Sequence, residues 1–205
     1  MKEIDHVMRY CMGVFFVLVV LTSCATIPEL TVNYGLPPKA DELKGKKIFL
    51  SLVDNRAVKD ILGEGARKEF KNFSGNISLS LARGKDEGFK VGLYDLSSLF
   101  MEVLKRRLQN LGAEVAPERN QADVEVAIVL KEFLLDLIDR KWTVTVRYET
   151  RLVKNKKVLA KQTISSQGER VKLVGRRQAD TVLSEIFTEM INKLDAKRFL
   201  EQANQ

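Results

Sequence analysis

Residues 122–165 limit the fold more than any other part of the chain. Three stretches with strand character follow one another there, and the middle one, Trp142 to Val153, alternates apolar and polar residues with many β-branched side chains. The strands are expected at 122–138, 142–153 and 158–165, with polar turns at 139–141 and 155–157. Consecutive strands joined by such short turns run antiparallel, so this segment predicts an antiparallel meander.

Two further segments have the periodicity of amphipathic helices. From Asp95 to Leu111 the apolar residues recur every three or four positions, Asp95 is a suitable N-cap, and Gly112 suits a left-handed C-terminal position. From about Arg176 to Leu194 the apolar residues again keep to one face. Helices and meander together predict an α+β fold, a two-layer sandwich in which two amphipathic helices cover one face of a mainly antiparallel sheet.

Other strands are shorter. Strand-forming residues at 47–53 end at the polar turn Asp54-Asn55-Arg56. Additional short strands are expected at 76–81, 89–93 and 113–115. The sequence contains no internal repeat, so we expect a single α/β domain from 46 to 205.

The N-terminal segment has the order of features found in a lipoprotein signal peptide. The apolar run from Tyr10 to Leu21 is shorter than the about 20 residues that a membrane-spanning helix needs. Small residues and a cysteine follow it, so Leu21-Thr22-Ser23-Cys24 is interpreted as a lipobox, with cleavage before Cys24 and lipidation of Cys24. The alternative is an uncleaved N-terminal anchor in which Cys24 is incidental.

This interpretation divides the chain into three parts. Residues 1–23 are the expected signal peptide, 24–45 a lipidated N-terminus with a flexible tether, and 46–205 a periplasmic domain. The tether holds Pro28, Pro37 and Pro38, and as a coil it would span about 25 Å. An edge strand at 30–34 is a secondary possibility.

The lipobox also decides the compartment. Cys11 would leave with the signal and Cys24 would carry lipid, so the mature chain would have no cysteine for a disulfide. Residue 25 is Ala rather than Asp, which by resemblance to lipoprotein sorting in enteric bacteria favours the periplasmic face of the outer membrane over the inner membrane. The net charge of +7 favours anionic lipid, lipopolysaccharide or peptidoglycan as neighbours, and export makes nucleic acid an unexpected partner.

The order of these features resembles the YajG-like family of uncharacterised bacterial lipoproteins. The resemblance rests on the lipobox, the proline-bearing tether, the strand ending at Asp54-Asn55-Arg56, the helix closed by Leu111-Gly112, the alternating hairpin and the C-terminal helix. It covers essentially the whole chain and implies no activity, because none is established for that family. The broader pattern also looks like the auxiliary lipoproteins that accompany lipid-transporting ABC systems.

Several kinds of enzyme lack required residues. The only histidine, His6, lies in the signal, which excludes Ser-His-Asp and Cys-His triads and histidine–zinc sites, and no metal or cofactor is expected. Residues 63–68 lack the spacing of a phosphate-binding loop and are expected to form a flexible loop. A hydrolase with paired carboxylates is the third-ranked function, with Asp136, Asp139 and Glu132 as candidates; such acidic residues near a turn are usually solvated.

Basic residues form a candidate surface for an anionic partner. They are Lys154, Lys156, Lys157, Lys161, Arg170, Lys172, Arg176 and Arg177. They would form one patch only if the meander and the N-terminus of the last helix adjoin; otherwise they are solvated residues that protect strand edges.

The only tryptophan, Trp142, is expected in the core, and exposure would instead indicate a contact residue.

Two functions follow. The first is a non-enzymatic envelope lipoprotein, anchored through Cys24, that binds another envelope component: a protein, peptidoglycan or anionic lipid. The second is an auxiliary lipoprotein of a lipid-transporting ABC system, which would need an apolar cavity or groove of some hundreds of Å³. The oligomeric state is open.

Overall fold

The computed structural model describes residues 29–83 and 88–202. Cys24, the signal peptide and the first residues of the expected tether lie outside the described residues. The elements are β1 (Leu30–Leu36), β2 (Lys47–Asp54), α2 (Glu64–Glu69), β3 (Ile77–Arg83), β4 (Phe89–Tyr94), α3 (Leu96–Asn110), β5 (Glu114–Ala116), η1 (Arg119–Gln121), β6 (Val124–Ile138), β7 (Lys141–Lys154), β8 (Lys157–Val171), α4 (Arg177–Asn192) and α5 (Ala196–Glu201).

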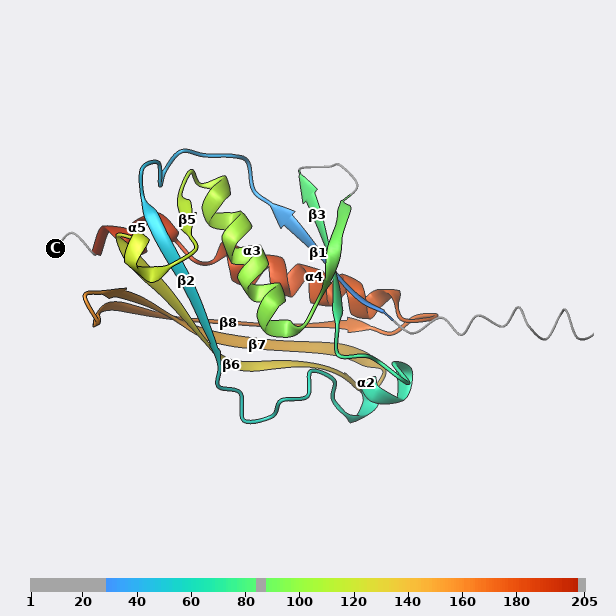
Figure 1. The fold of residues 1–205 in the computed structure, drawn as a ribbon. Coiled ribbons are helices and arrows are strands. Elements are labelled where there is room, and N and C mark those ends of the chain that lie inside the picture. Colours follow the sequence, from blue (N-terminus) through green and yellow to red (C-terminus); the bar gives the residue numbers. More distant parts are fainter. Residues whose placement is uncertain (1–28, 84–87, 203–205) are drawn as a thin grey trace, which may run out of the picture.

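The predicted fold class is confirmed. The long strands β6, β7 and β8 form the antiparallel meander, and α3 and α4 cover one face of this sheet (Figure 1). Four aromatic rings fill the space between the layers: Phe100 of α3 lies edge-on against Phe133, Tyr148 and Phe187, with centroids 5.1 to 6.2 Å away. Edge-to-face pairs of this kind stabilise a core beyond their buried area.

The opposite face of the meander is polar. Strand β7 alternates buried residues with half-buried or exposed ones, as expected when only one face of a sheet is covered. Arg147 of β7 forms an ion pair across this solvated face with Glu132 of β6, at 3.1 Å. Trp142, at the start of β7, is fully buried with its ring 5.8 Å from that of Phe70, so it is a core residue.

Two features of the sheets were not predicted from the sequence. First, β2 pairs in parallel with both β5 and β6, so the main sheet, in the order β5-β2-β6-β7-β8, is mixed. Second, β1, β3 and β4 form a separate three-stranded sheet. The short strands expected at 76–81 and 89–93 are β3 and β4, which pair antiparallel, and β1 pairs in parallel with β3.

Strand β1 corrects the boundary expected at residue 46, because residues from Leu30 onward already belong to the folded domain. The expected tether contains buried Leu30, Val32 and Tyr34. The free edge of β1 lies against α4, where Thr31, Asn33 and Gly35 donate their backbone N–H groups to Asp180, Ser184 and Thr188 at 2.9 to 3.2 Å. Alternate residues of a strand point their N–H groups to the same side, and positions four apart share a helix face, so the two patterns match.

The stretch after β1 also belongs to the domain. Asn110, the last residue of α3, donates its side-chain amide to the carbonyls of Pro37 and Pro38. Leu43 is buried and donates its N–H to the Leu111 carbonyl at 2.8 Å. Gly112 takes a φ of 92°, the left-handed conformation expected at the end of α3.

The 63–68 stretch is a short helix, not the expected flexible loop. A side chain at Gly65 would place its Cβ 2.0 Å from the carbonyl oxygen of Leu137, and one at Gly63 would meet the Asp136 carboxylate at about the same distance. The Asp136 carboxylate accepts the backbone N–H of Ala66 at 3.1 Å and thereby caps the first turn of α2. The glycines are therefore required because α2 lies directly on β6.

The contact of β1 with α4 predicts a pH-dependent stability. Burial raises the pKa of Asp180 to about 6, although the N–H of Thr31 acts in the opposite direction. A raised pKa means that the folded chain holds the proton more tightly than the unfolded chain, so this contribution is complete below about pH 4 and is lost as the pH rises through 6. In urea unfolding, Asp180→Asn should gain stability relative to the wild type between pH 4 and pH 7. Parallel stability curves over this range would contradict the prediction.

Candidate functional site

The candidate site begins where β2 ends, at the carboxyl end of a strand in the parallel part of the sheet. In sheets with parallel strands, crevices outside the carboxyl ends are common binding positions. Asp54 accepts the backbone N–H of Arg56 at 3.0 Å and also binds its guanidinium with both carboxylate oxygens, at 3.0 and 2.9 Å. This turn is the Asp54-Asn55-Arg56 segment that the sequence places after the strand.

Arg56 is buried because it fills a gap beside β6. Strand β2 pairs with the first half of β6, up to Leu130, and then leaves it. The chain returns at Leu62, which forms an isolated parallel bridge to Leu135. Between these points the Arg56 guanidinium lies 3.5 Å from the carbonyl of Phe133, so it partly satisfies a backbone acceptor that no strand reaches.

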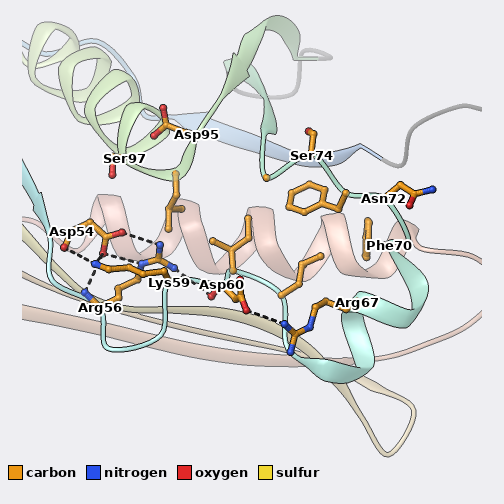
Figure 2. Close-up of a pocket in the computed structure, with 15 residues that line it drawn as sticks. Asp54, Arg56, Lys59, Asp60, Arg67, Phe70, Asn72, Ser74, Asp95 and Ser97 are labelled. Carbon is orange, nitrogen blue, oxygen red and sulfur yellow. Dashed lines mark hydrogen bonds and ion pairs between the residues drawn. The ribbon is translucent and has the colours of Figure 1, made fainter.

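The segment between the end of β2 and Leu62 borders an open groove of about 680 Å³ beneath the N-terminus of α3, here called the α3 groove (Figure 2). The apolar part of its lining, here called its floor, comes from several segments and consists of Ile61, Leu62, Phe70, Phe73 and Leu96. Charged residues follow one rim: Asp54, Arg56, Lys59, Asp60 and Arg67. Polar residues from the 72–75 loop and from the start of α3 complete the other rim.

The charges of the rim are paired. The guanidinium of Arg56 and the ammonium of Lys59 hold the pKa of Asp54 well below its usual range, at about 2. Asp60 pairs with Arg67 at 2.9 Å. On the opposite rim, the Ser98 N–H and hydroxyl lower the pKa of Asp95, which caps α3. The groove therefore presents fixed charges of both signs around an apolar floor, an arrangement suited to binding an amphipathic chain segment.

A second open hollow, here called the β2 hollow, lies on the other side of the first turn of α3. It measures about 620 Å³ and shares Ser97 with the α3 groove. Its lining is more apolar and includes the half-buried side chains of Leu52, Tyr94, Met101 and Val115. Glu102 and Lys105 supply charged groups in its lining.

The three carboxylates considered for hydrolysis do not form a pair. Asp136 caps α2, Glu132 is bound to Arg147 on the outer face of the sheet, and Asp139 belongs to the β6–β7 turn with a φ of 48°. None of them lines the α3 groove or the β2 hollow. Their positions give each a local structural role and no shared reaction site.

The eight basic residues fall into separate groups. Lys154, Lys156 and Lys157 lie at the β7–β8 turn, and Lys161 follows on β8. Arg170, Lys172, Arg176 and Arg177 lie at the other end of β8 and the start of α4. Because β8 is an extended strand between Lys157 and Val171, the two ends are about 45 Å apart, and the residues do not form one patch.

Residues of the second group have local partners. Arg170 binds Glu185 at 2.6 and 2.8 Å, Lys172 binds Glu69, and the Arg176 guanidinium lies 5.3 Å from the centre of the Phe70 ring.

Within 29–83 and 88–202, no helix is long and apolar enough to cross a membrane. The same residues contain no group of three or more His, Cys, Asp or Glu side chains arranged to bind a metal.

The fold has counterparts among solved structures. The chain is similar to protein XCC0632 from Xanthomonas campestris, described under the family DUF330, with a TM-score of 0.54 and 13% identity over 85% of this chain and 98% of that chain. It is more distantly similar to a minor lipoprotein from Acinetobacter baumannii (TM-score 0.41, 10% identity, 78% and 92% covered) and to lipoprotein GNA1162 from Neisseria meningitidis (TM-score 0.39, 11% identity, 72% and 99% covered). No family model and no curated protein matches the sequence.

At these identities the likeness to XCC0632 shows a shared fold, and the two lower scores support no argument. The YajG-like resemblance therefore remains a prediction. The residues of the α3 groove were not predicted from the sequence; the only signal was the charged turn Asp54-Asn55-Arg56, which marks the end of β2 but not the burial of Arg56.

The buried position of Arg56 predicts a large effect of its removal. Only 5% of the Arg56 side chain is exposed, so Arg56→Met would remove a buried guanidinium and leave the half-buried Asp54 carboxylate, 24% exposed, with only the exposed Lys59 as a charged partner. We expect a loss of about 3 kcal/mol in the free energy of unfolding, measured with urea at pH 7. Arg147→Met is the matched control, because its pair with Glu132 is exposed and worth less than about 1 kcal/mol. Equal losses in both variants would contradict this role of Arg56.

Proposed function

We propose that this protein is a non-enzymatic lipoprotein of the bacterial envelope that is anchored through lipid on Cys24 and binds another envelope component in the α3 groove. The order of apolar run, small residues and Cys24 supports the anchor. Ala25 supports the periplasmic face of the outer membrane. The charged rims and apolar floor of the groove favour a protein segment as the bound component over peptidoglycan or anionic lipid.

The packing between the helices and the main sheet favours a binding surface over a lipid carrier. A carrier needs an apolar cavity or groove of some hundreds of Å³ that buries most of the acyl chain. Here Phe100, Phe133 and Phe187 occupy the space between the helices and the main sheet. The α3 groove and the β2 hollow are both open to solvent at the edge of this core, which favours a binding surface.

The β2 hollow keeps the second function under consideration. An auxiliary lipoprotein of a lipid-transporting ABC system would have to accept or pass an acyl chain, and the half-buried apolar side chains of Leu52, Tyr94 and Met101 offer the most apolar surface for it. The hollow is open rather than enclosed, so this function ranks second.

Photo-crosslinking in living cells tests the proposal. A photoreactive amino acid is placed at Ser74, on the rim of the α3 groove, and at Thr163, an exposed position on β8, as the matched control. We expect one discrete envelope protein to be captured from position 74 and not from position 163. This capture should be lost in Cys24→Ala, which should no longer incorporate labelled fatty acid or sediment with outer membranes.

Different outcomes of this experiment would contradict different parts of the proposal. Capture from position 163 alone would overturn the groove as the binding surface. Unchanged membrane sedimentation of Cys24→Ala would overturn the anchor. A third photoreactive position, Lys105 in the β2 hollow, separates the two functions, because capture there of acyl lipid or an ABC permease would favour the auxiliary lipoprotein.

A further inference from the structure

The described chain begins at one end of the domain, and this end is formed by three neighbouring parts. Thr31 donates its N–H to Asp180 in the first turn of α4, so the start of β1 lies beside the start of that helix. The β8–α4 loop, here taken as residues 171–177 so that it includes the last residue of β8 and the first of α4, leads into the same turn (Figure 1). The backbone N–H of Lys172 binds the carbonyl of Arg140, which adds the β6–β7 turn.

The distance from the lipid to this end is short. Cys24 and Glu29, the first described residue, are five positions apart in the sequence, so the chain between them reaches at most about 18 Å. The expected tether was longer because it included the residues that form β1. With β1 in the domain, a lipid on Cys24 would hold this end close to the bilayer.

The β8–α4 loop exposes apolar side chains next to basic ones. Val174 is 95% exposed, Leu173 is 68% exposed and Val171 is 56% exposed. The charged side chains of the loop are all basic: Lys172, Arg176 and Arg177. Apolar side chains that enter the boundary between head groups and acyl chains, flanked by basic residues that contact anionic head groups, are characteristic of interfacial membrane contact.

Contacts on several sides hold the loop in place. Lys172 forms an ion pair with Glu69 of α2, and the Arg176 guanidinium lies over the Phe70 ring. Arg170, at the end of β8, binds Glu185 of α4. These pairs neutralise part of the positive charge, so burial of Leu173 and Val174 is the main favourable contribution to a membrane contact, and head-group attraction is secondary.

We propose that the β8–α4 loop docks on the membrane beside the lipid anchor, with Leu173 and Val174 entering the interface. The proposal rests on the lipidation of Cys24 proposed above. The β7–β8 turn offers a similar combination, since Val158 and Leu159 are exposed beside Lys156 and Lys157. It lies about 45 Å away along β8, well beyond the reach of the chain from Cys24, so docking at the β8–α4 loop directs the turn away from the bilayer.

A fluorescent probe on the lipidated protein tests this orientation. Cys11 leaves with the signal and the Cys24 sulfur carries lipid, so a cysteine introduced by Val174→Cys is the only thiol that can be labelled. The matched control is Val158→Cys at the far end of β8. Each protein is labelled with an environment-sensitive dye and reconstituted into vesicles of phosphatidylethanolamine and phosphatidylglycerol, with and without a lipid-borne spin-label quencher.

We expect the emission from position 174 to shift to the blue and to be quenched at least threefold more strongly than emission from position 158. Co-flotation of the protein with the vesicles reports the anchor separately. Co-flotation with a water-exposed probe at 174, or with equal quenching at both positions, would overturn the docking and leave the anchor standing. Failure to float would overturn the anchor and the docking together. A blue shift without vesicles would indicate contact between copies of the chain and would also overturn the docking.

Discussion

The long central strand β6 needs hydrogen-bond partners along its whole length, and the way they are supplied determines much of the structure. Strand β2 covers β6 only as far as Leu130. Leu62 covers it again at Leu135, and Arg56 approaches the carbonyl left between them. Buried backbone groups without partners are costly, so the chain after β2 must swing out and return. That excursion positions α2 and encloses the α3 groove.

The edge of the small sheet is completed in a different way. Strand β1 has β3 on one side, and on the other side it has a row of polar side chains on α4 instead of a further strand. This covers an edge that would otherwise be available for pairing with another chain. It also attaches the N-terminal strand to the helix that follows the β8–α4 loop, so the start of the domain and this loop are held at the same end.

The helices and the meander could be predicted from the sequence because their signals are local. The periodicity from Asp95 to Gly112 and the alternation from Trp142 to Val153 each extend over many residues and agree with their flanking turns. The position of β1 could not be predicted, because its partner β3 lies far away in the sequence and seven residues of alternation identify no partner. The glycines at 63–68 predict a loop because glycine is typical of loops, whereas here they permit close contact with β6.

The candidate site was harder to predict than the fold. A charged residue after a strand usually belongs to a solvated turn, and nothing local distinguishes Arg56, which is buried because β2 is shorter than β6. The basic residues lie close together in the sequence, but an extended strand separates its ends almost as widely as a chain can. Their distribution therefore depended on the length of β8.

The attachment of β1 also has a mechanical consequence. A chain anchored by lipid at Cys24 and held elsewhere by a partner would be pulled at the first residue of β1. Seven residues of β1 pair with β3, and three of its N–H groups bind α4, all roughly across the strand direction. A pull along the strand would load these bonds together, in shear, instead of breaking them one after another. The attachment point is thus a strand whose geometry resists tension.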